Sequence, residues 1–105
     1  MLSSKQRAFL RSIAVDIDTI LMVGKGGMSA EIIKQAEDAL FKREIIKGKV
    51  LTETCPLSPR EVADEIAEAT ESEVVQVIGS KFVLYKKNEK EPIIVLPKVR
   101  KTNLG

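Results

Sequence analysis

A short apolar run, Thr19 to Val23, leads directly into Gly24-Lys25-Gly26-Gly27, and a helical pattern begins near Ser29. An apolar run of this length that is closed by glycines is typical of a buried strand rather than of a helix. A helix that follows a strand crosses over the sheet before the next strand can pair, which favours an α/β layer arrangement. This one unit therefore predicts the fold class.

The rest of the chain extends the unit to the order α-β-α-β-α-β-β. Helices are predicted over about residues 4–15, 29–42 and 58–70, with Ser3, Ser29 and Ser58 as their N-caps. Strands are predicted over residues 19–23, 44–51, 73–78 and 81–87. The last two are joined by Gly79-Ser80, a turn that suits a hairpin, and residues 92–97 could add an edge strand between two prolines. We predict a single compact α/β domain with a mixed four-stranded sheet.

Length and composition agree with one globular domain. The chain has 105 residues, of which 44% are hydrophobic and 30% are charged. No apolar run approaches the roughly 18 residues that span a bilayer, and residues 1–11 do not resemble a secretory signal. We expect a cytoplasmic protein without a membrane partner, with the domain over residues 1–97 and a basic tail over residues 98–105.

The absence of histidine narrows the possible chemistry. Histidine is the commonest general base near neutral pH and the commonest metal ligand, and this chain has none. Its single cysteine, Cys55, cannot form a zinc site alone and has no base near it in the sequence to activate it. We expect neither an enzyme nor a bound cofactor or metal.

Charge is distributed unevenly along the chain. Residues 1–49 contain nine basic and six acidic side chains, residues 50–80 contain one and seven, and residues 81–105 contain seven and two. The acidic middle comes from the outer face of the third predicted helix, which carries Asp64, Glu65, Glu68 and Glu71. Two basic segments therefore flank an acidic one, and the fold decides which charges share a face.

The Gly24-Lys25-Gly26-Gly27 loop is the main candidate for a binding site. Glycines at the start of a helix let backbone N–H groups approach an anion, and Lys25 adds a positive charge. The loop matches neither the P-loop nor the dinucleotide-binding pattern, so a turn that is rich in glycine only for geometry remains an alternative. Arg7, Arg11, Lys47 and Lys49 are predicted nearby, either as ordinary solvated charges or as contacts for RNA phosphates.

Several ordered blocks of sequence carry a family resemblance. They are Ser4-Lys5-Gln6-Arg7 with Leu10-Arg11, Val23 to Ser29, Ala39-Leu40, Arg43 to Lys47, Val74 to Gly79, and Val83-Leu84-Tyr85. On these residues the chain resembles the CRM domain (chloroplast RNA splicing and ribosome maturation), whose stand-alone bacterial members are the YhbY-type proteins. The resemblance covers about residues 2–97.

The resemblance implies a non-enzymatic RNA-binding domain, similar in fold to the C-terminal domain of bacterial translation initiation factor three. It implies binding to structured RNA, in particular precursor RNA of the large ribosomal subunit, and assistance in ribosome assembly. The implied contacts are the loop residues Gly24, Lys25, Gly26 and Gly27 and the surrounding basic residues Lys5, Arg7, Arg11, Lys47 and Lys49. The chain departs from the family pattern at Asp16 and Asp18, which could weaken RNA contact beside the loop, and at Gly48, which should loosen the second strand.

Two other functions remain open. A protein-interaction module could use the edge strand at residues 92–97 or the acidic third helix. An enzyme acting on a small phosphate compound could use the Gly24 loop, with Asp16 and Asp18 holding Mg²⁺. The few aromatic residues argue against RNA recognition by base stacking on a sheet, and Tyr85 is expected to pack within its strand.

Overall fold

The computed structural model describes residues 2–97, and within them it contains three helices and four strands. In chain order these are α1 (Ser4–Ala14), β1 (Thr19–Val23), α2 (Ala30–Arg43), β2 (Ile45–Val50), α3 (Pro59–Thr70), β3 (Glu73–Ile78) and β4 (Lys81–Tyr85). The strands form one sheet in the order β1-β2-β4-β3, in which β1 and β2 are parallel and the other pairs are antiparallel. The predicted order of elements and the mixed four-stranded sheet are confirmed. The predicted basic tail lies outside the described residues.

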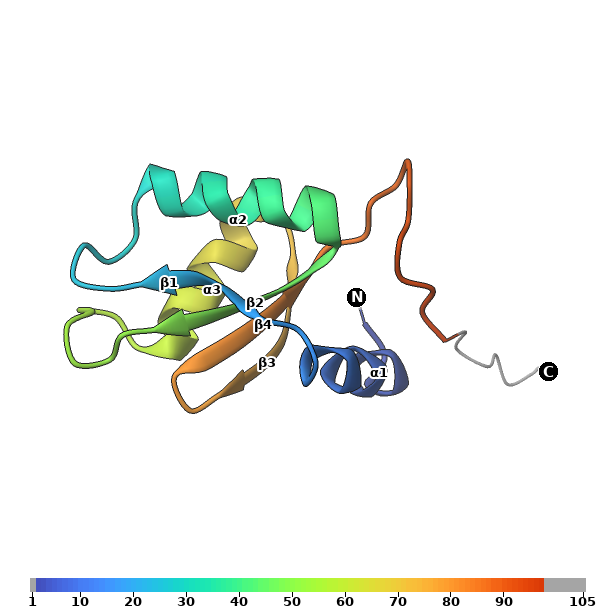
Figure 1. Ribbon diagram of the computed structural model, residues 1–105, viewed down its shortest axis with the longest axis horizontal. Helices are drawn as coiled ribbons and strands as arrows, with labels where there is room; N and C mark the ends of the chain where they lie inside the picture. Colours follow the sequence, from blue (N-terminus) through green and yellow to red (C-terminus); the bar gives the residue numbers. More distant parts are fainter. Residues whose placement is uncertain (1, 98–105) are drawn as a thin grey trace.

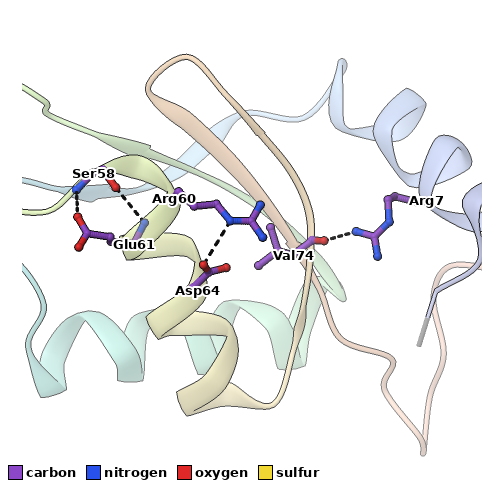
Figure 2. Close-up of polar contacts among 6 residues, drawn as sticks. All are labelled: Arg7, Ser58, Arg60, Glu61, Asp64 and Val74. Atoms are coloured by element: carbon purple, nitrogen blue, oxygen red, sulfur yellow. Dashed lines mark hydrogen bonds and ion pairs between the residues drawn. The ribbon is translucent and has the colours of Figure 1, made fainter.

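Serine caps set where the three helices begin. The Ser58 hydroxyl accepts from the Glu61 backbone N–H at 3.1 Å, and the Glu61 carboxylate accepts from the Ser58 N–H at 2.9 Å (Figure 2). The same reciprocal pair joins Ser3 and Gln6, and Ser29 caps α2 through the N–H of Ile32. The hydrogen bonds from the Ser58 backbone and hydroxyl lower the pKa of Glu61. Each cap satisfies N–H groups that a helix start leaves without a partner.

The sheet separates two hydrophobic cores. On one face, α2 and α3 pack against the strands through side chains that include Leu40, Ile66 and Phe82. On the other face, α1 packs through Leu10 and Ala14 against Ile45, Val75, Val83 and Tyr85. Figure 1 shows α1 beside the end of the sheet where β1 begins, whereas the β1–α2 and β2–α3 loops project from the opposite end. The second face is therefore covered at one end only.

Glu44 organises the chain that follows β4. It is fully buried with a positive φ of 65°, and its carboxylate accepts hydrogen bonds of 2.6 to 2.7 Å from the N–H groups of Asn88, Ile93 and Ile94. The Glu44 carboxylate thus binds the backbone N–H groups of Ile93 and Ile94, which a strand would need for pairing. Residues 92–97 form no strand, and the expected edge strand is wrong. Beyond this anchor, the Gln6 side chain donates to the carbonyl of Pro97 at 3.2 Å.

The predicted ends of the elements differ from the structure by one or two residues. Val15 is the C-cap of α1 rather than its last residue, and α2 extends to Arg43. β2 excludes Glu44 and Leu51, and β4 ends at Tyr85, so Lys86 and Lys87 follow it. Helix and strand ends depend on tertiary contacts that periodicity does not show.

Gly48 lies under an aromatic ring in the middle of β2. It pairs with Phe82 of β4, and a Cβ atom built on it would lie 2.2 Å from Phe82 Cζ. The ring thus occupies the space that a side chain at position 48 would need. The expectation that Gly48 loosens the strand is wrong, because Phe82 is fully buried over it and belongs to the core.

Candidate functional site

The Gly24-Lys25-Gly26-Gly27 loop is a tight turn with an exposed tip. The N–H of Gly27 donates to the carbonyl of Gly24 at 2.9 Å, which places Lys25 and Gly26 at the two central positions. Only Gly27 among the four has a positive φ, 62°, and it is buried against Pro56. The turn therefore requires a positive φ at Gly27 and not at Gly26.

A neighbouring loop holds this turn in place. The N–H of Leu51 donates to the carbonyl of Val23 at 2.8 Å, and a Cβ atom on Gly24 would lie 3.1 Å from Leu51 Cδ1. Cys55, in the same loop, is partly buried and packs against the core between the sheet and α2 and α3. The turn thus presents Lys25 from a packed base rather than from a long free loop.

The start of α2 has acidic neighbours on one side. A hollow of about 360 Å³ is lined by Met28, Ser29, Ile33, Glu65, Glu68 and Ala69. Its two carboxylates come from α3 and disfavour a phosphate that approaches from that side. The side of the turn that faces α3 is therefore the less favourable approach for an anion.

A row of four side chains crosses this uncovered part of the sheet. Strand register pairs Met22 with Lys49, Lys49 with Lys81, and Lys81 with Ile78, so the row runs across β1, β2, β4 and β3. We call Met22, Lys49, Lys81 and Ile78 the open row. Lys49 and Lys81 lie directly opposite each other, an arrangement that destabilises an antiparallel pair unless an anion compensates the charges. Among residues 2–97, no carboxylate lies within ion-pair distance of either lysine.

A groove lies between the open row and the end of α1. It has a volume of about 200 Å³ and is lined by Arg11, Ala14, Val15, Lys47, Gln76, Ile78, Lys81 and Val83. Lys47 lies two residues before Lys49, and register aligns it with Val83 and Gln76 across the sheet. The structure therefore brings together Arg11, Lys47 and Lys49, which the sequence singled out, with Lys81 and Gln76, which it did not.

Arg7 is separated from this basic surface by its own hydrogen bonds. Its guanidinium donates to the carbonyl of Val74, as Figure 2 shows. It also donates to the carbonyl of Val75, where β3 bulges between Val74 and Gln76. The side chain thus fastens α1 to β3. Lys5 is exposed in the first turn of α1, whereas Arg11 lies in the last turn beside the groove.

The acidic positions lie away from the open row. Asp16 and Asp18 precede β1, about 15 Å along the strand from the glycine turn, so the expectation that they lie beside the loop is wrong. α3 packs on the opposite face of the sheet from the lysines, where Asp64 forms an exposed 3.2 Å ion pair with Arg60 (Figure 2). Nowhere in residues 2–97 do three acidic, cysteine or histidine side chains gather in a way that could hold a metal ion.

The aromatic side chains of the sheet are not available for stacking. Phe82 and Tyr85 are both buried, so the expectation that Tyr85 packs within its strand is confirmed. Burial raises the pKa of Tyr85, and the negative charges of Glu44 and Glu89 add to the effect. A ligand of the open row would therefore meet lysines and aliphatic side chains.

Comparison with protein families identifies the domain. The model of the CRS1 / YhbY (CRM) domain matches residues 2–86, which include α1, the glycine turn and all four strands. The chain belongs to this family. As a CRM domain it has curated relatives of nearly the same length, and the suspected resemblance is confirmed.

Relatives of this CRM domain are found in several bacteria. It is 42% identical over 97 residues to the "Probable RNA-binding protein YqeI" of Bacillus subtilis, covering 92% of this chain and all of that one. It is 35% identical over 100 residues to an "RNA-binding protein" of Haemophilus influenzae, covering 92% and 96% of the two chains. The solution structure of SAV1595 from Staphylococcus aureus matches with a TM-score of 0.74 and 44% identity, covering 92% of this chain and all of that one. In residues 2–97, no helix has the length and apolar character that crossing a membrane requires.

Proposed function

We propose that this CRM domain is a non-enzymatic protein that binds structured RNA through one basic surface. The surface consists of the Gly24-Lys25-Gly26-Gly27 turn, Lys49 and Lys81 of the open row, and Arg11 and Lys47 of the groove. Lys5, exposed in the first turn of α1, is a further proposed contact. Arg7 contributes indirectly, because its hydrogen bonds to β3 hold α1 in position.

The pair Lys49 and Lys81 carries this proposal. Two cations that face each other across strands, with a third cation two residues away, lower the stability of the sheet unless they bind something negative. RNA phosphates supply that charge at regular spacing. The names of the relatives, which describe RNA-binding proteins, support the same ligand class.

Precursor RNA of the large ribosomal subunit is the proposed target, and assistance in ribosome assembly in the cytoplasm is the proposed role. Membership of the CRM family supports this part of the proposal. Electrostatic binding without base stacking suits folded ribosomal RNA, which presents closely spaced backbone phosphates.

The first test is the salt dependence of RNA binding. If four to six phosphates are contacted, log K should fall against log salt concentration with a slope of roughly −3 to −5. Fluorescence anisotropy titrations with a fragment of ribosomal precursor RNA between about 50 and 300 mM salt measure the slope. A slope near zero would contradict the proposal.

A pair of variants at Gly26 tests whether the glycine turn contacts phosphate. Gly26 has open space around it and no positive φ, so Gly26→Ala should leave both folding and binding unchanged. Gly26→Asp adds a negative charge beside Lys25 and should weaken RNA binding about tenfold, because it repels the phosphate that Lys25 attracts. Binding titrations and thermal melts of both variants separate the two effects. Equal binding by the two variants would show that the turn is structural.

The rival functions have lost part of their support. The protein-interaction hypothesis relied in part on an edge strand at residues 92–97, and those residues form no strand. The phosphate-enzyme hypothesis relied on Mg²⁺ at Asp16 and Asp18, which lie at the far end of β1 from the turn. The exposed acidic face of α3 still favours a protein partner.

A further inference from the structure

The groove beside the open row combines two kinds of surface that a simple phosphate clamp does not need. Arg11, Lys47 and Lys81 supply positive charge, while Val15, Ile78 and Val83 supply apolar carbon. Val15 is 78% exposed and Ile78 is 63% exposed, and Met22 at the far end of the open row is 55% exposed. Single exposed apolar side chains are common on protein surfaces, but here three of them border a group of cations that form no ion pair within residues 2–97.

A matching ligand must present negative charge and flat apolar surface within a few ångströms of each other. A nucleotide does so, because its phosphate lies beside the face of its base. In an A-form duplex the base faces are stacked inside and only the backbone, the 2′-hydroxyls and the base edges reach a protein. Against such a duplex, Val15 and Ile78 would lose water without gaining an apolar contact.

Gln76 adds a polar group to the floor of the groove. It is partly buried, it is aligned with Lys47 through Val83, and its amide forms no hydrogen bond with any other residue in 2–97. A side-chain amide can both donate and accept, as the edge of an unpaired base requires. The bulge in β3 between Val74 and Gln76 places this side chain on the same face as the lysines.

We propose that the groove receives unpaired nucleotides, so that this domain prefers RNA with an internal loop or single-stranded segment over continuous duplex. Lysines of the open row and Arg11 hold the backbone, Val15 and Ile78 contact base faces, and Gln76 contacts a base edge. The inference rests on the proposed function, since it concerns the same surface, but it adds a requirement for base contact that phosphate binding does not include.

The test uses two RNA hairpins of equal length, one fully paired and one with a four-nucleotide internal loop, each titrated at the same series of salt concentrations. The parent protein should bind the looped hairpin about tenfold more tightly, which corresponds to about 1.4 kcal/mol. The double variant Val15→Thr/Ile78→Thr should reduce this preference to about twofold while leaving affinity for the paired hairpin and its salt slope unchanged. Both side chains are exposed, and a thermal melt verifies that the variant remains folded.

The matched control is Ile93→Thr/Val95→Thr. These side chains are 59% and 85% exposed and have the same chemistry, but neither lines the groove. The control should retain the tenfold preference. The inference is overturned if the parent binds both hairpins equally, if Val15→Thr/Ile78→Thr keeps the preference, or if the control loses it as well. Steep, salt-dependent binding without preference would overturn this inference alone, whereas absence of salt-dependent binding to both hairpins would overturn the proposed function.

Discussion

Replacing Gly48 with alanine should lower the free energy of unfolding by about 3 kcal/mol and the melting temperature by about 12–24 °C. A glycine-to-alanine change in a strand ordinarily stabilises a protein slightly, because alanine restricts the unfolded chain. Here the added methyl would lie 2.2 to 2.8 Å from three atoms of the Phe82 ring. The ring is fully buried and has no free space into which it could move. Alanine at position 48 should therefore destabilise the protein instead of stabilising it.

A control and a second-site change make this prediction specific. Gly26→Ala adds the same methyl where no atom lies within 4 Å, and it should melt near the parent temperature. Phe82→Leu should destabilise the parent but partly rescue Gly48→Ala, because the smaller side chain yields space to the methyl. Additive losses in the double variant, or a Gly48→Ala protein that melts like the parent, would show that the ring does not fill this space.

This packing matters for the proposed binding surface because Gly48 lies between two of its lysines, Lys47 and Lys49. Phe82 packs against β2 on the face of the sheet that α2 and α3 cover. Lys47 and Lys49 project from the other face of the same strand. The ring therefore supports the segment that presents the lysines. Loss of RNA binding by a Gly48 variant would consequently report on the fold rather than on contact.

Local sequence signals were sufficient to predict most of the fold. Serine caps with a partner three residues later define the starts of α1 and α3, and short apolar runs between glycines or charges define the strands. The residues 92–97 show where such signals fail. Their apolar pattern resembles a strand. However, the backbone N–H groups of Ile93 and Ile94 donate to the buried carboxylate of Glu44, more than 45 residues earlier, instead of to a neighbouring strand.

The candidate site was only partly predictable for a similar reason. Alternation along β2 indicates that Lys47 and Lys49 share a face, which is local information. That Lys81 completes the pair depends on β4 lying beside β2, which is a property of the sheet order. For Arg7 the local information was misleading. Helical spacing places it beside Arg11, but its guanidinium donates hydrogen bonds to carbonyls at the bulge in β3 and is not free to bind RNA.

Replacing Lys47, Lys49 and Lys81 together with alanine should weaken RNA binding about 100-fold or more at 0.1 M salt. Each phosphate contact contributes close to a factor of eight at that concentration, and the slope of log K against log salt should become shallower by about 2 to 3. Stability should change little, because the variant loses charges that are exposed or only partly buried and also the repulsion between Lys49 and Lys81. The control replaces Lys34, Lys42 and Lys90, which are exposed outside the groove and the open row, and should bind RNA within about threefold of the parent.

A single charge reversal separates binding from folding most sharply. Lys49→Glu would place a carboxylate opposite Lys81 and turn a repulsive cross-strand pair into an attractive one, which should raise stability by about 0.5–1 kcal/mol. The same change removes one phosphate contact and repels a second phosphate, so affinity should fall about 30-fold or more. Stability and affinity would then move in opposite directions, as expected if the lysine pair is kept at a cost to the fold because it binds an anion. A variant that is less stable than the parent, or one that binds RNA as tightly, would show that the facing lysines have no such role.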